Sequence, residues 1–150
     1  MAARYIETLR LITHAWQCDH MGHVNVGFYM GWLGDAAFAL LSMYGLNRAQ
    51  AAAENLGAAA VRAEVDYQAE LHGGDMVRLE TTVDSIGARK IVFHHRLIRI
   101  GDEKQVMAAR VIGVCIDTVQ RKSRAFPQDF VDRIAATFDI QPAVPKEAAA

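Results

Sequence analysis

Apolar residues dominate one uninterrupted stretch of the chain, residues 28–45, in which Asp35 is the only charged residue. A helix that is apolar on every side must be surrounded by other parts of the protein or by lipid. Its length approaches the lower limit for a membrane span, but Asp35, Gly31 and Gly34 weaken that interpretation. Because the rest of the chain offers amphipathic strands, we expect a buried core helix and no membrane partner.

Apolar and polar positions alternate from Val61 to Leu71 and predict a half-exposed strand. Turn residues then punctuate the chain, and the pattern predicts three further strands at residues 76–86, 90–100 and 105–118. The last of these is apolar on both faces, which is typical of a strand at the centre of a sheet. Four consecutive strands predict a single antiparallel sheet, and the central strand indicates that both of its faces are covered.

Shorter elements are expected on either side of this sheet. Residues 5–17 have the composition of a strand. Asn47 and Gln50 have the spacing of a capping box and predict a short alanine-rich helix that ends at Gly57. Pro127 predicts the start of a last helix, whose apolar stripe would pack on the sheet edge. The stripe consists of Phe130, Ile134 and Phe138. We expect one α+β domain over residues 1–140 and a mobile tail at 141–150.

The composition of the 150-residue chain narrows the range of partners. Its sixteen basic and seventeen acidic residues are scattered without a basic stripe, which argues against nucleic acid as a partner. Charged residues occur near the start of the sequence, before any apolar segment of signal-peptide length. We therefore expect a cytoplasmic protein. Cys18 and Cys115 do not make a disulfide framework, and we expect two reduced thiols.

The residues best suited to chemistry lie just before the apolar helix, in the run Cys-Asp-His-Met-Gly-His-Val-Asn at 18–25. Asp19 can act there as a nucleophile or a base. Backbone N–H groups around Val26 and Gly27 can hold developing negative charge, because the first turn of a helix has free donors and a positive dipole end. Gly22 allows the tight turn that would bring the two together. The alternative is that Asp19 only caps the following turn.

The segment from Asp19 to Tyr29, Asp-x-x-Gly-His-Val-Asn-x-x-x-Tyr, resembles the signature of the 4-hydroxybenzoyl-CoA thioesterase-like family. That resemblance extends over nearly the whole chain and implies the hot-dog fold, a long antiparallel sheet wrapped around one central helix. It implies an acyl-CoA thioesterase that uses no metal or other cofactor and assembles as a homodimer or homotetramer. Asp19 would be catalytic, while His23, Asn25 and Tyr29 would shape the loop or face the substrate.

Two further sets of residues are candidates for substrate binding. Arg89 and Lys90 look like the basic turn with which the family meets the phosphates of coenzyme A, since both side chains suit phosphate. Phe28 and Trp32 could line an apolar acyl pocket, although aromatic residues on such a helix are more often part of the core.

Several alternatives remain open from the sequence. His20 and His23 with Asp19 invite a metal site, but their spacing is no established signature. Asp35 is a second-choice catalytic acid on the helix itself. An enoyl-CoA hydratase or dehydratase on the same fold would use a different Asp and His pattern, and a non-catalytic acyl-CoA binding module would not need Asp19. Val26 and Gly34 depart from residues common in the family, which puts the substrate more in doubt than the reaction.

Overall fold

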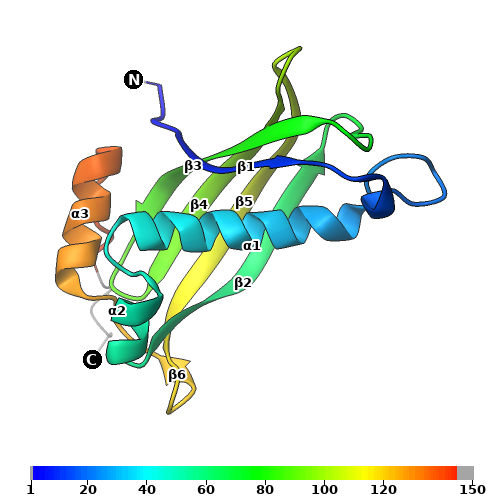
Figure 1. The fold of residues 1–150 in the computed structure, drawn as a ribbon. Coiled ribbons are helices and arrows are strands. Elements are labelled where there is room, and N and C mark those ends of the chain that lie inside the picture. The colour runs from blue at the N-terminus through cyan, green and yellow to red at the C-terminus, as the bar shows by residue number, and fades with distance from the viewer. Residues whose placement is uncertain (1, 145–150) are drawn as a thin grey trace.

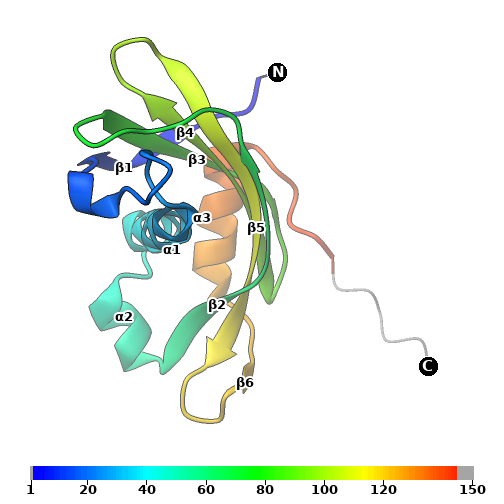
Figure 2. The same ribbon diagram turned by 90° about the vertical axis from the view of Figure 1, so that its right-hand side faces the viewer.

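The computed structural model describes residues 2–144, in which a curled antiparallel sheet carries three helices on its concave face (Figures 1 and 2). The longest helix, α1, runs along the middle of that face. This arrangement confirms the predicted α+β fold, a long sheet wrapped around a central helix. The elements are β1 (Ile6–Ile12), a 3-10 turn (Ala15–Gln17), α1 (Val26–Met43), α2 (Arg48–Ala53), β2 (Leu56–Tyr67), β3 (Met76–Ile86), β4 (Lys90–Arg99), β5 (Lys104–Asp117), β6 (Lys122–Ser123) and α3 (Gln128–Phe138).

The strands follow the order β1-β3-β4-β5-β2, with the short β6 paired to the end of β5. All pairs are antiparallel, and β5 lies between β4 and β2. It is therefore an inner strand, as its apolar faces indicate, but the strand at the centre of the sheet is β4. β2 is an edge strand, and it pairs along its whole length with β5. Its other side has no strand partner within residues 2–144, so its backbone groups there are available to another strand.

The hydrophobic core lies between α1 and the concave face of the sheet. Six residues of α1 are buried against it, but Val26, Met30, Phe38 and Met43 are exposed. The helix is long and apolar enough to pass a length-and-composition test for a membrane span, a test that core helices of soluble proteins also pass. Only 33% of it is buried, so the expectation of a fully surrounded helix was wrong for one chain. The sheet covers one side of α1 and leaves the other uncovered.

Two expected boundaries near the start of the chain and after α1 were wrong. The first strand ends at Ile12, because the chain turns away from the sheet and forms the 3-10 turn at 15–17. The alanine-rich helix ends at Ala53, and β2 begins before Gly57. Asn55 takes a left-handed backbone conformation with φ 52°. An α-helix cannot continue through such a residue, so the helix ends before the predicted Gly57.

The alternation predicted from Val61 onward is interrupted by a bulge. The register of β2 against β5 shifts between Ala60 and Arg62, and the intervening Val61 is 61% exposed. A bulge adds one residue to a strand and re-aims its side chain. The strand is therefore real, but it runs from Leu56 to Tyr67. Val61 is turned out at the bulge, whereas Val65 and Ala69 of the predicted apolar face pack against the core and Leu71 is buried.

The last helix begins after Pro127 as predicted, and the three residues of its stripe are buried. The expected packing on the sheet edge was wrong, because α3 packs against β3, an inner strand. The tail differs from the expectation in its first residues, because the Ala143 N–H donates to the Ile86 carbonyl at 2.7 Å and attaches the chain to the sheet. Residues 145–150, the rest of the expected mobile tail, lie outside the described residues.

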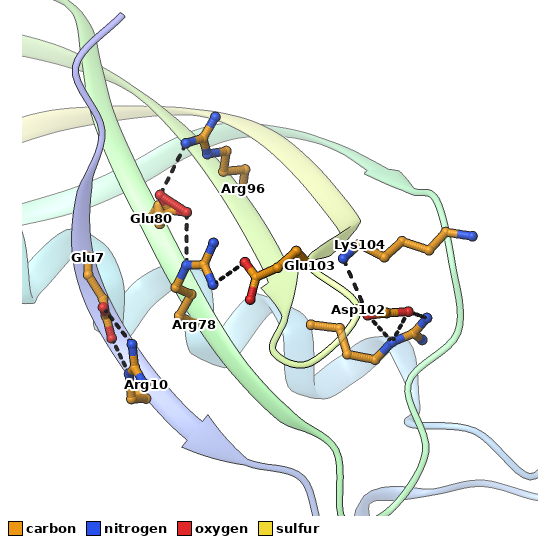
Figure 3. A network of polar contacts seen from close by, with 9 residues as sticks. Glu7, Arg10, Arg78, Glu80, Arg96, Asp102, Glu103 and Lys104 are labelled. Atoms are coloured by element: carbon orange, nitrogen blue, oxygen red, sulfur yellow. Dashed lines mark hydrogen bonds and ion pairs between the residues drawn. The ribbon is translucent and has the colours of Figure 1, made fainter.

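Charged side chains occupy the outer face of β3 and its neighbours, as Figure 3 shows. Glu80 accepts from Arg78 and from Arg96 at 3.1 Å each, and Arg78 also pairs with Glu103 at 2.6 Å. The Arg96 guanidinium lies 3.9 Å from the centre of the Tyr5 ring. On this part of the outer face, the charged side chains pair with one another. No helix of the same chain covers it among residues 2–144, although the sequence predicted that both faces of the sheet are covered.

Candidate active site

The loop before α1 is a short hairpin closed at its base by a bridge between Cys18 and Val24. The Asp19 N–H donates to the His23 carbonyl at 3.1 Å, and the Gly22 N–H donates to the Asp19 carbonyl at 3.0 Å. Gly22 takes φ +82°, a conformation that favours glycine over any other residue. The sequence run therefore forms a tight turn with Asp19 at its first position, and Gly22 has the structural role expected of it.

Asn25 forms the link between this turn and the helix. Its side-chain oxygen accepts the Gly27 N–H at 3.0 Å, which makes it the N-cap of α1. Its side-chain nitrogen donates to Asp19 Oδ2 at 2.8 Å. Because the cap is at Asn25, α1 begins at Val26, two residues before the expected start. Asp19 does not cap this helix, but it does cap the turn that follows it, because its Oδ1 accepts the Met21 N–H.

The Asp19 carboxylate is held by hydrogen bonds to both oxygens. Besides the Asn25 contact, Oδ1 accepts the Met21 N–H at 2.9 Å. The Asn25 amide first, and then the Met21 N–H, lower the pKa of Asp19 below its ordinary value, and His23 and His20 lower it further. Asp19 is therefore ionised at neutral pH, and its side chain is only partly buried, so the carboxylate can reach a ligand.

The first backbone donors of α1 differ in how they are used. The Gly27 N–H is engaged by the Asn25 side chain, and the Phe28 N–H donates to the Asn25 carbonyl at 3.1 Å. The Val26 N–H finds no acceptor among residues 2–144. Of the two amides that the sequence pointed to, Val26 is thus the one left open for a ligand, at the positive end of the helix dipole.

A cavity of about 330 Å³ adjoins the loop and the amino end of α1. The rings of Tyr29 and Tyr67 meet edge to face in its wall, with centroids 5.2 Å apart. Burial raises the pKa of Tyr29 to about 12, so its hydroxyl stays protonated. The lining residues are His23, Val24, Val26, Tyr29, Tyr67, Gln68, Ala69 and Glu70.

The sequence did not predict the part of the cavity wall that comes from β2 and the loop after it. Tyr67, Gln68 and Glu70 are more than forty positions from the residue 18–25 loop, and no local signal joins the two segments. The connection is made by the Val24 N–H, which donates to the Leu71 carbonyl at 2.7 Å. Only the folded backbone brings this segment to the loop.

Phe28 and Trp32 do not line the cavity. Trp32 is buried in the core, with its ring centroid 5.2 Å from that of Tyr29. Phe28 lies on the other side, where it meets the exposed Trp16 edge to face at 5.6 Å. Within one chain, Trp32 is therefore part of the core, and Phe28 packs near the surface against Trp16.

Arg89 and Lys90 lie far from Asp19 in the same chain. They form the turn between β3 and β4, and the Arg89 guanidinium donates to the Ser123 carbonyl at 3.0 Å. Along β5, Met107 faces Tyr67 next to the cavity, whereas Val114 faces Lys90. Seven residues of strand separate these points, about 23 Å at 3.3 Å per residue. Figure 1 shows the β3–β4 turn at the opposite end of the sheet from the residue 18–25 loop.

The remaining candidates lie outside the loop. Asp35 is exposed on α1, so it needs no buried partner. Cys115 is buried and Cys18 partly buried, and both are free thiols. Across residues 2–144 no group of three or more His, Cys, Asp or Glu side chains is close enough to hold a metal ion.

Comparison with known proteins identifies the family of the chain. The sequence profile of the thioesterase-like superfamily matches residues 13–134. The acyl-CoA thioester hydrolase YbgC of Escherichia coli O157:H7 is 25% identical over 113 residues, which cover 75% of this chain and 84% of YbgC.

Two solved structures share the fold. One is a Staphylococcus aureus protein in complex with CoA, with a TM-score of 0.84, 18% identity and coverage of 100% of this chain and 98% of its own. The other is the 1,4-dihydroxy-2-naphthoyl-CoA thioesterase of Synechocystis, with a TM-score of 0.75, 19% identity and coverage of 88% and 96%.

The fold and the profile together define a hot-dog protein of the thioester hydrolase class. The chain belongs to the thioesterase-like superfamily.

Proposed function

We propose that the protein hydrolyses an acyl-CoA thioester, with Asp19 as nucleophile or general base and the Val26 N–H as donor to the oxyanion. The observation that carries the proposal is the position of the ionised Asp19 carboxylate, hydrogen-bonded through Asn25 to the amino end of α1. An attacking carboxylate and an open backbone donor are the two groups that thioester hydrolysis requires.

The electrostatics of the loop favour attack over proton donation. A carboxylate whose pKa lies below the ordinary value stays ionised at neutral pH, so Asp19 suits a nucleophile or base and not a general acid. If Asp19 attacks directly, a mixed anhydride forms, the thiolate of CoA leaves, and water then cleaves the anhydride. If Asp19 acts as a base, it takes a proton from the water that attacks the same carbonyl. The tetrahedral intermediate then expels the CoA thiolate, which takes up that proton and leaves the free acid.

The substrate class follows from the relatives and the cavity. YbgC is named as an acyl-CoA thioester hydrolase, and one structural neighbour is a 1,4-dihydroxy-2-naphthoyl-CoA thioesterase. The cavity beside the loop has a volume of about 330 Å³ and two tyrosine rings in its wall, which is enough for a short or aromatic acyl group. We therefore propose acyl-CoA as the substrate.

A second copy of the chain would complete the site. The basic turn of Arg89 and Lys90 is about 23 Å along the sheet from the cavity, so a bound CoA would meet it more readily on a partner chain. An apolar groove of about 130 Å³ runs between the uncovered side of α1 and the edge strand β2, and Phe38 and Ala59 are among its residues. An unpaired edge beside an apolar groove supports a homodimer built through this side.

The experiment is a thiol-release assay with a panel of short, branched, long and aromatic acyl-CoAs. We expect Asp19→Asn to lower kcat by about a thousandfold or more on the best substrate, because loss of a catalytic carboxylate has effects of this size. Asp35→Asn tests the second-choice acid in the same assay. We expect it to leave turnover unchanged, and a loss of turnover there but not in Asp19→Asn would assign the catalytic role to Asp35. Full turnover by Asp19→Asn contradicts the proposal, and CoA binding without turnover by the wild type indicates a binding module.

A further inference from the structure

One side chain, that of Asn25, contacts both the candidate carboxylate and the helix that carries the candidate donor. Its nitrogen donates to Asp19 Oδ2 at 2.8 Å, and its oxygen accepts the Gly27 N–H at 3.0 Å. Its backbone is also engaged, because its N–H donates to the Gln17 carbonyl at 2.9 Å and its carbonyl accepts the Phe28 N–H. Both polar atoms of the Asn25 side chain, its backbone N–H and its backbone carbonyl are therefore hydrogen-bonded, which fixes the residue in place.

The chemistry of this bridge suits asparagine better than the other residues that cap helices. Serine, threonine and aspartate also accept the Gly27 N–H, which is why they are favoured N-caps. Ionised aspartate has no proton to donate to Asp19 and would add a second negative charge beside it. Serine is shorter and has one hydroxyl for two contacts. The cap alone thus does not explain an asparagine, whereas the contact with Asp19 does.

We propose that Asn25 is a positioning residue, which holds the Asp19 carboxylate at a fixed separation from the amino end of α1. The inference rests on the proposed function, in which Asp19 and the Val26 N–H act on one thioester carbonyl. Without Asn25, the Met21 N–H still contacts one oxygen of Asp19, but nothing ties the carboxylate to the helix. A misplaced reacting group lowers the rate of the chemical step while substrate binding persists.

Other charges near Asp19 set the background for a test that varies pH. His20 and His23, both in the loop, lower the pKa of Asp19 less than the Asn25 and Met21 contacts do. Both histidines stay in place when Asn25 is replaced. A change in Asp19 titration between variants therefore reports the Asn25 contact.

The test compares three variants. Asn25→Ser keeps a capping oxygen and loses the amide donor, while Asn25→Ala loses both. Asn47→Ala is the control, because Asn47 caps α2 in the same way, with its side chain accepting the Gln50 N–H at 3.0 Å, and does not contact Asp19. We expect both Asn25 variants to lower kcat about tenfold with KM changed less than twofold, and Asn47→Ala to leave both unchanged.

A second readout does not need turnover. The Met21 amide proton, which points to Asp19, reports the titration of that carboxylate by NMR. We expect the pH midpoint of the Asp19 titration, followed by this proton, to move to higher pH in both Asn25 variants and to stay unchanged in Asn47→Ala. Wild-type kcat together with an unmoved midpoint in Asn25→Ser overturns the inference. If the wild type hydrolyses no thioester, the proposed function fails, and the Met21 midpoint still decides whether Asn25 controls Asp19.

Discussion

His95 ends a buried chain of polar side chains that crosses three strands. Thr8 on β1 donates to the Leu79 carbonyl at 3.2 Å, and its oxygen lies 2.8 Å from that of Thr81. Thr81 in turn lies 2.9 Å from His95 Nδ1. If each hydroxyl donates once, Thr81 donates to Thr8 and His95 Nδ1 carries the hydrogen. Nε2 of His95 is then an unprotonated nitrogen in the core with no hydrogen-bond partner among residues 2–144.

The buried imidazole predicts a loss of stability in acid. Burial, and to a lesser degree His94, lowers the pKa of His95 from 6.5 to about 4. Between these values the unfolded chain binds a proton that the folded protein does not, so the stabilisation is complete above pH 6.5 and is lost as pH falls toward 4. We expect this group to reduce the free energy of unfolding by about 3 kcal/mol between pH 7 and pH 4.

Urea unfolding at a series of pH values measures this effect. His95→Gln has no group that titrates in this range, and the carboxylates with lowered pKa values, such as Asp19 and Asp102, remain in both proteins. We expect the gap in stability between wild type and variant to change by about 3 kcal/mol over that range. Parallel curves for the two proteins would show that His95 does not carry the effect.

At the level of elements, the interior of α1 contains glycines that its packing does not require. A Cβ added at Gly31 meets no atom within 4 Å, so the position is open as well as helical. Gly101, in the turn between β4 and β5, is equally open but takes φ +117°. The two positions differ in backbone conformation and not in available space, which makes them a matched pair.

We expect Gly31→Ala to raise the free energy of unfolding by about 0.5–1 kcal/mol, because alanine reduces the entropy of the unfolded chain and suits a helix. Gly101→Ala is expected to lower it by about 1 kcal/mol, because its backbone conformation disfavours a side chain. Urea denaturation of both variants checks the signs. A destabilised Gly31→Ala would mean that this side of α1 is in close contact with another chain.

At the scale of the whole molecule, residues 2–144 leave an apolar face of α1 beside the edge of β2, which pairs with no other strand among them. Phe38 is 57% exposed at the groove between α1 and β2, so a charge placed there costs the single chain little. The proposed homodimer would bury this side chain. Val119, 70% exposed in the turn after β5, is an apolar residue away from the groove.

We expect Phe38→Asp to convert the protein to monomers and to reduce its thioesterase turnover at least about tenfold, because burying an unpaired charge at an interface is unfavourable. Val119→Asp should keep the wild-type mass and activity. Light scattering coupled to size exclusion gives the mass of each variant, and circular dichroism shows whether it is folded. A wild type that is monomeric and fully active would contradict the two-chain site.

Much of this protein was determined by short stretches of its sequence. The strands after residue 75, the inner place of β5, and α3 with its Phe130 stripe follow from periodicity and turn residues, which act over a few positions. The turn at Gly22 was also predictable, since its chemistry is contained in adjacent residues.

Tertiary structure decided the features that depend on distant segments. The Val24 to Leu71 hydrogen bond brings Tyr67 and Glu70 to the loop, and no local pattern encodes such a pairing. The bulge at Val61 and the 23 Å between Arg89 and the cavity depend on strand register, which the whole sheet sets. The sequence alone thus determined which residues could do chemistry, and the fold decided which of them meet, because side chains separated along the chain are brought together only by packing.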